Sequence, residues 1–189
     1  MHLRIAQFHD IEVYEALVGI VRVPPQRSGG RIPHWRLEPG MCPIAYGLTS
    51  YGKLDHVGGY WSGARPVLWD VDVSADAGQP IAIYASGVLT GIQAQWRYHE
   101  APGGDPVLLA AAMRGDQLSV LARPGRPGTP AFPIIVPAEH AAAWALAPSV
   151  TRDLIAQLPH LGAGLFRSWP IADPRSREDR ADVIEPLLA

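Results

Sequence analysis

Short apolar runs separated by turn residues form the pattern of this chain. Residues 3–8 alternate weakly between apolar and polar positions, which predicts a strand. Asp10 follows as a predicted N-cap. After it, apolar residues recur at helical spacing, at Ile11, Tyr14, Leu17 and Val18. We therefore expect the chain to begin with a strand and then a helix.

Most of the remaining chain also predicts short strands, divided by turns that contain Gly or Pro. The expected strands are residues 44–48, 67–73, 81–85, 88–98, 106–113, 117–121, 133–136 and 165–171. Residues 139–146, which Pro137 introduces, and residues 150–158 predict helices. Loops or turns are expected at residues 23–30, 52–63, 102–104 and 123–130. This mixture predicts an α+β fold.

Composition favours a single folded domain. The chain has 189 residues, of which 48% are hydrophobic, enough for one compact domain spanning residues 1–189. Charged residues make up 18% of the chain, and the formal net charge is -2. The 19 Pro and 19 Gly residues favour many turns over long helices, in keeping with the α+β class.

The sequence also argues against several classes of protein. No apolar run approaches the ~18 residues of a transmembrane helix, and the first residues lack a signal-peptide core, so we expect a cytoplasmic protein without a membrane partner. Cys42 is the single cysteine, which excludes an intramolecular disulfide and a Cys-rich zinc motif. The seven histidines show no metal-ligand spacing, and we expect neither a metal nor another cofactor.

Arginine dominates the basic residues, because Lys53 is the only lysine among the 16 Lys and Arg side chains. The planar guanidinium presents donors that suit phosphate or carboxylate, so this bias is compatible with nucleic-acid contact. The near-neutral net charge argues against a broad, strongly basic face.

The first eight residues, Met1 to Phe8, read Met-His-Leu-Arg-Ile-Ala-Gln-Phe. They resemble the Met-Cys-Gly-Arg-Phe-x-x-Phe/Tyr start of the SOS-response-associated peptidase (SRAP) family. Residues 46–53 (YGLTSYGK) are similar to the family's Trp-Gly-Leu-x-Pro-x-Trp-x-Lys motif, and residues 92–96 (IQAQW) to its Gly-Phe-Tyr-Glu-Trp strand. Other family motifs are echoed, in the same order, by residues 33–40, 63–67, 129–136 and 170–172. The chain thus resembles a divergent SRAP member over nearly its whole length.

The resemblance implies a curved, largely antiparallel β-sheet or barrel with flanking helices and a groove for single-stranded DNA. In the family, removal of the initiator Met exposes a cysteine at the second position. Its amine and thiol attack the aldehyde of an abasic site and close a thiazolidine ring, with help from a carboxylate and a polar orienting group. The implied setting is DNA damage and the SOS response.

The residues at the four reactive positions of the family differ in this chain. His2 stands for the cysteine, Gly63 for the Asn, Gln95 for the Glu and Thr129 for the His. The amide of Gln95 keeps hydrogen bonding but does not exchange a proton near neutral pH. We therefore expect thiazolidine and autopeptidase chemistry to be lost.

Three basic positions of the family's DNA groove are retained. Arg4 and Arg65 fall where the family places groove arginines, and Lys53 closes the segment that resembles the Trp-Gly-Leu motif. These residues are expected to contact phosphates. The alternative is that Arg4 and Arg65 pair with acids such as Asp55 or Asp70.

Trp96 is a candidate for stacking on bases, as are Trp61 and Trp69. The alternative is that these large aromatic side chains belong to the core.

The leading hypothesis is a SRAP-like protein that binds single-stranded or abasic DNA without family chemistry. One alternative is a protein-interaction or structural module that reuses the scaffold. Another is a Schiff-base-type DNA enzyme that acts on abasic sites and uses the Met1 amine or His2.

Overall fold

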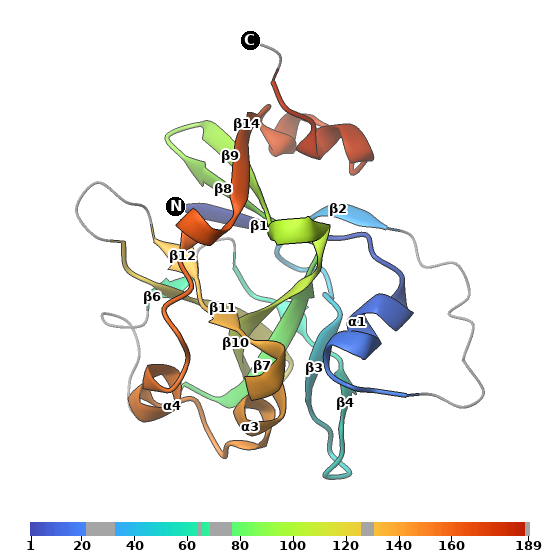
Figure 1. Ribbon diagram of the computed structural model, residues 1–189, viewed down its shortest axis with the longest axis vertical. Helices are drawn as coiled ribbons and strands as arrows, with labels where there is room; N and C mark the ends of the chain where they lie inside the picture. Colours follow the sequence, from blue (N-terminus) through green and yellow to red (C-terminus); the bar gives the residue numbers. More distant parts are fainter. Residues whose placement is uncertain (22–32, 64–65, 69–76, 126–130, 188–189) are drawn as a thin grey trace.

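Two sheets dominate the structure, a computed structural model that describes residues 1–21, 33–63, 66–68, 77–125 and 131–187 (Figure 1). Both sheets are mainly antiparallel, and the helices are few and short. The expected α+β class is confirmed in this coarse form.

The first sheet has five strands in the order β14-β9-β8-β1-β2, each antiparallel to its neighbours. Its strands are β1 (His2–Gln7), β2 (His34–Leu37), β8 (Gly87–Ile92), β9 (Gln95–Glu100) and β14 (Arg167–Ile171). The N-terminal strand therefore lies inside this sheet, between β8 and β2.

The second sheet follows the order β12-β11-β10-β7-β3-β4, with β13 beside β10. The short strands β5 and β6 run parallel to β11. The bounds are β3 (Ala45–Leu48), β4 (Leu54–Val57), β5 (Tyr60–Trp61), β6 (Val67–Leu68), β7 (Gln79–Ala85), β10 (Val107–Arg114), β11 (Gln117–Arg123), β12 (Phe132–Pro133) and β13 (Ile135–Val136). Strand pairing within the described residues does not close either sheet into a barrel.

The α-helices among the described residues are α1 (Ile11–Leu17), α3 (Ala141–Leu146) and α4 (Arg152–Ala156). Short 3-10 helices are η1 (Pro102–Gly104), η2 (Ala138–His140), η3 (Ala163–Leu165), η4 (Pro174–Ser176) and η5 (Ala181–Ile184). Asp10 occupies the predicted N-cap of α1 but makes no side-chain cap bond, whereas the Thr151 hydroxyl accepts a hydrogen bond from the Leu154 amide in α4. In the part of the chain that is described, no helix is long and apolar enough to cross a membrane.

The predicted strand at residues 88–98 is wrong, because the chain reverses direction in its middle. Gln93 and Ala94 both have positive φ angles, 48° and 68°, and join β8 to β9 in a tight hairpin. Such a two-residue turn normally contains Gly, Asn or Asp. Because Gln93 and Ala94 are none of these, the residues here do not predict a turn. The short strands β2, β4 and β5 were also missed, the last two within the Gly-rich stretch expected as a loop.

Hydrophobic side chains fill three layers around the two sheets. Leu3 and Ile5 of β1 share a buried cluster with Ile83 of β7, which places this cluster between the sheets. The other face of the nine-stranded sheet packs against the helices through residues such as Trp144. The other face of the five-stranded sheet is covered by the C-terminal segment, in which Val183 is buried.

Gln7 joins the two sheets through its buried side chain. Its Nε2 donates to the carbonyl oxygens of Ile44, at 3.0 Å, and Tyr84, at 2.6 Å. Its Oε1 accepts from the Ile44 amide at 2.9 Å. Because Gln7 belongs to β1 and Tyr84 to β7, these three bonds fix how the first strand sits against the second sheet.

Candidate functional site

The candidate site surrounds the start of β1. His2 lies opposite Gly91 of β8, and Gly91 lies opposite Trp96 of β9. Opposed residues of antiparallel strands point to the same face, so His2, Trp96 and, two residues along β1, Arg4 share one side of the sheet. We call this side the Arg4 face. The rings of His2 and Trp96 lie 6.5 Å apart, and a Cβ on Gly91 would come within 2.6 Å of the Trp96 ring.

Arg4 is the most unusual side chain on this face, because its exposed fraction is only 9%. Its Nη1 donates to the neighbouring Leu3 carbonyl at 3.0 Å, and its buried Nε has no hydrogen-bond partner among the described residues. Burial lowers the pKa of the Arg4 guanidinium from its ordinary value, but arginine stays charged in proteins. Burying a charged donor without an acceptor costs free energy. An anion that accepted a hydrogen bond from the Arg4 guanidinium would remove this cost.

Four further charged side chains surround Arg4, and with it they form what we call the Arg4 cluster. The other members are Arg36, Glu38, Asp173 and Arg175, whose charges all act on the Arg4 pKa. Arg36 Nη1 donates to the Glu38 carboxylate, while the buried Arg36 Nε also lacks a partner within the described part of the chain. Three guanidiniums face two carboxylates, so the cluster carries an excess of positive charge.

Asp173 and Arg175 reach this site from the C-terminal end of the chain. Arg175 Nε donates to both oxygens of the Asp173 carboxylate, at 2.9 and 3.1 Å, and Nη2 donates to one of them at 2.5 Å. The hydrogen bond with Arg175 lowers the pKa of Asp173, which keeps that carboxyl ionised. The Arg175 guanidinium carbon also lies 5.8 Å from the centre of the Trp96 ring, within cation–π range.

The structure brings together three of the residues singled out from the sequence, namely His2, Arg4 and Trp96. Gln95 is exposed at the start of β9, where strand alternation points its side chain to the face opposite that of Trp96, away from His2 and Arg4. Lys53 is exposed in the turn between β3 and β4, which Figure 1 shows at the end of the molecule opposite the C-terminal segment.

The remaining predicted positions add little to this site. Gly63 follows β5 and is partly exposed, while Arg65 and Thr129 lie outside the described residues. Among the described residues, the acids that act on Arg4 are Glu38 and Asp173, whereas Asp55, suggested as a partner from the sequence, lies on β4 of the other sheet. Asp70 lies outside the described residues.

The tryptophans considered for base stacking are mostly enclosed. Trp96 is 3% exposed and Trp61 is 1% exposed, so both belong to the core as the structure stands. Trp69 lies outside the described residues. Trp96 is covered in part by Arg175 of the C-terminal segment, whereas Trp61 lies in the cluster between the two sheets.

A second buried polar pair lies on the opposite face of the same sheet. Thr90 Oγ1 and His99 Nε2 are 2.8 Å apart, and both residues are buried. Burial lowers the pKa of His99 to about 4, so the imidazole is neutral at pH 7. His99 Nδ1 has no hydrogen-bond partner, and its ring packs edge-on against Phe132. The strand alternation places this pair with the core residues, away from His2 and Arg4.

Ser86 resembles a nucleophile in its contacts but serves to fix the backbone. Its Oγ lies 2.7 Å from His9 Nδ1 and 2.5 Å from the Tyr14 hydroxyl. It also accepts from the amides of Phe8 and His9, and Ser86 is 1% exposed. These contacts hold the turn between β1 and α1 and leave the hydroxyl inaccessible.

Sequence reasoning missed four members of the Arg4 cluster: Arg36, Glu38, Asp173 and Arg175. Arg36 and Glu38 fall within residues 33–40, which resemble a family motif, and Asp173 and Arg175 lie near the C-terminal end, where the sequence suggests no role for them. No pattern along the chain connects these segments to Arg4. The described residues contain no group of three His, Cys, Asp or Glu side chains placed to hold a metal ion.

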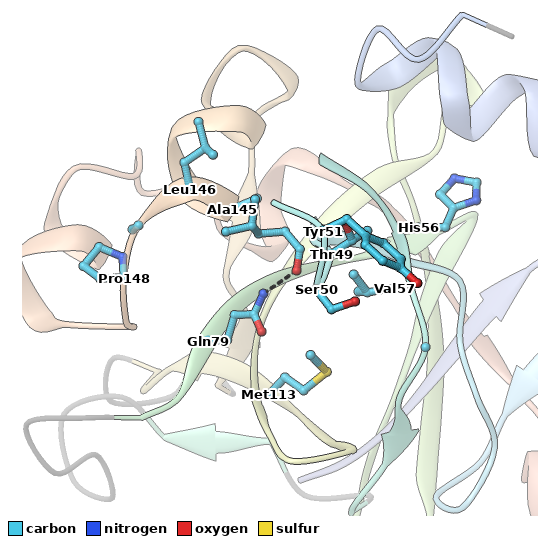
Figure 2. A pocket seen from close by; sticks show the side chains of 13 residues that line it. Thr49, Ser50, Tyr51, His56, Val57, Gln79, Met113, Ala145, Leu146 and Pro148 are labelled. Carbon is cyan, nitrogen blue, oxygen red and sulfur yellow. Dashed lines mark hydrogen bonds between the residues drawn. The ribbon is translucent and has the colours of Figure 1, made fainter. Parts of the chain in front are cut away.

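A separate pocket of about 710 Å³ lies between the β3–β4 hairpin and the end of α3. Figure 2 shows Tyr51 and Val57 on one side, Leu146 on another, and Gln79 and Met113 below them. Gln79 Nε2 donates to the Leu48 carbonyl at 2.7 Å. The lining of this pocket contains His56 but no Asp, Glu, Lys or Arg, so it offers no permanent charge to a phosphate or carboxylate.

Comparison with known proteins supports the fold. No family model and no curated protein matches the chain. A phage-related protein from Bordetella bronchiseptica has a similar structure, with a TM-score of 0.63 and 18% identity over 89% of this chain and 93% of its own. A second protein from that organism has a TM-score of 0.64 and 12% identity over 90% and 99% of the two chains. A protein from Bacteroides thetaiotaomicron has a TM-score of 0.57 and 11% identity over 96% and 92%. At these identities the likeness concerns the fold alone, and the resemblance to SRAP stays a prediction.

Proposed function

We propose that this chain is a SRAP-like protein that binds the sugar-phosphate backbone of single-stranded DNA. It forms no thiazolidine ring with an abasic site. The supporting observation is the buried Arg4 guanidinium, whose Nε lacks an acceptor beside a second unpartnered Nε on Arg36. Phosphodiester oxygens are acceptors that suit such guanidiniums, and contacts to the backbone need no particular base. The resemblance of the first strand to SRAP favours a single strand of DNA over other polyanions.

The loss of family chemistry follows from the residues themselves. A histidine at position 2 has no thiol, so it cannot supply the sulfur of a thiazolidine ring. Gln95 cannot act as an acid or base near neutral pH, and strand alternation points it to the face opposite His2 and Arg4. Binding without covalent attachment is the activity that remains.

Fluorescence anisotropy with a labelled single-stranded oligonucleotide tests this proposal. Three phosphate contacts, one for each arginine of the cluster, predict a slope of about -2 for log affinity against log salt, at ~0.7 per contact on single strands. Substitution R36M should reduce the steepness by about 0.7. The matched variant K53M removes a cation far from the cluster and should leave the slope unchanged. Absence of binding at low salt would refute the proposal and favour a protein-interaction module.

The same oligonucleotide with an abasic site separates binding from catalysis. Borohydride reduction would trap an imine formed by the Met1 amine as a stable covalent adduct. We expect no adduct. Its appearance in the wild-type protein, and its loss after blocking the terminal amine, would make the chain an enzyme instead.

A further inference from the structure

The C-terminal residues 173–187, which we call the strap, cover the Arg4 face. The strap follows β14 and runs through η4 and η5, which Figure 1 shows beside β2 at the end of the molecule where β14 terminates. Val183 is buried against the sheet, and the Trp169 indole donates to the Ile184 carbonyl at 2.7 Å. The Leu187 amide donates to the Pro170 carbonyl at 3.0 Å.

One carboxylate anchors the middle of the strap to the edge of the sheet. Asp179 Oδ1 accepts from the backbone amides of Trp35, at 2.6 Å, and Arg36, at 2.9 Å. Asp179 Oδ2 lies 2.8 Å from Nδ1 of His34. All three partners belong to β2, whose outer edge would otherwise present these amides to solvent.

The strap also places groups of suitable chemistry near the two positions that a nucleotide would use. The charge of the Asp173 carboxylate raises the pKa of Arg4, so this anion lies near the guanidinium, although the described contacts of this carboxylate are with Arg175 and not with Arg4. The planar Arg175 guanidinium lies over Trp96, the ring on which a base would stack. Asp173 and Arg175 thus lie near the places that the phosphate and the base of a bound nucleotide would take.

Apart from these contacts, the strap is loosely held. Of its residues only Pro174 and Val183 are buried, whereas more than half are exposed. A segment with few buried apolar contacts opens at a lower free-energy cost than the core of the fold. Opening would uncover Trp96 and remove Asp173 from the Arg4 cluster.

We propose that the strap is an autoinhibitory segment that competes with single-stranded DNA for the Arg4 face. This inference rests on the proposed function. Binding then requires the open form, so the apparent dissociation constant equals the intrinsic one divided by the open fraction. Any change that weakens the Asp179 anchor raises that fraction and tightens binding.

Substitution D179N tests the strap because it removes the anchoring charge but preserves the shape of the side chain. We expect D179N to bind the labelled oligonucleotide about tenfold more tightly than the wild type, since the open fraction multiplies affinity directly. The control D153N removes one negative charge from an exposed position on α4 and should change affinity less than about twofold. This control separates strap release from a general gain in positive charge.

Hydrogen exchange gives a second readout that does not depend on affinity. The Val183 amide, bonded to the Arg180 carbonyl at 3.0 Å, should exchange faster in D179N and also in the wild-type protein bound to the oligonucleotide. If the wild type binds DNA while this amide stays protected and D179N binds no tighter, the strap proposal is wrong and the proposed function stands. If neither protein binds DNA although exchange rises in D179N, the proposed function fails, and the competition with it.

Discussion

Replacing Arg4 by Met should stabilise the fold while weakening DNA binding. Met is unbranched and fills the space of the arginine stem, but it has neither the charge nor the donors. The two nearby acids keep partners after the change, because Glu38 is bonded to Arg36 and Asp173 to Arg175. The substitution therefore leaves no buried carboxylate unpaired.

The expected magnitude follows from the surroundings of the guanidinium. Removing a buried donor that lacks an acceptor recovers about 1–3 kcal/mol, and the loss of the bond from Nη1 to the Leu3 carbonyl costs about 1 kcal/mol. We expect the free energy of unfolding to rise by about 1 kcal/mol. The steepness of the salt dependence of DNA binding should fall by about 0.7, the share of one phosphate contact.

Urea denaturation measures the first quantity, and anisotropy across a salt series measures the second. Substitution R97M is the matched control, since Arg97 lies on the same sheet but is exposed and points away from the Arg4 face. It should change stability by less than about 0.5 kcal/mol and leave the salt slope unaltered. A loss of 2 kcal/mol or more in R4M would show that Arg4 is a structural ion-pair partner. An unchanged salt slope would show that Arg4 does not contact phosphate.

Two further predictions concern the framework of the site. Substitution Q7L removes the three hydrogen bonds between the sheets and should lower the free energy of unfolding by about 2–4 kcal/mol in urea denaturation. The control Q117L, at an exposed position, should change it by less than about 0.5 kcal/mol. Equal effects of the two substitutions would mean that Gln7 does not join the sheets. The pKa of His99 falls from 6.5 to about 4 on folding, so between these values the unfolded chain takes up a proton that the folded chain does not, and stability decreases as the pH falls. Between about pH 7 and pH 4, the free energy of unfolding should therefore fall by roughly 3 kcal/mol because of His99. Substitution H99Q should abolish this part of the pH dependence. An identical pH dependence of stability in both proteins would show that His99 is not its cause.

Much of the secondary structure was open to prediction because it depends on local patterns. The alternation in residues 3–8 and the helical spacing after Asp10 led to β1 and α1. The reversal at Gln93 and Ala94 was not predictable, since two non-glycine residues there adopt positive φ angles that their side chains do not favour. Because of this one turn, the residues predicted as one long strand form the β8–β9 hairpin, with Gln95 at the start of β9.

The sequence alone determined that position 2, where the SRAP family has its reactive cysteine, holds His2 and therefore no thiol. It also determined that Arg4 stands two residues further along. The sequence likewise determined which residues of the C-terminal strap carry a charge. Only the tertiary structure decided that Arg4 is buried without an acceptor for its Nε, and that Asp173 and Arg175 lie beside it. Asp179 and His34 are 145 positions apart, yet they meet at the edge of β2. The reason is physical: strand propensity depends on neighbouring residues, whereas burial and ion pairing depend on which distant segments the packing of the sheets brings together.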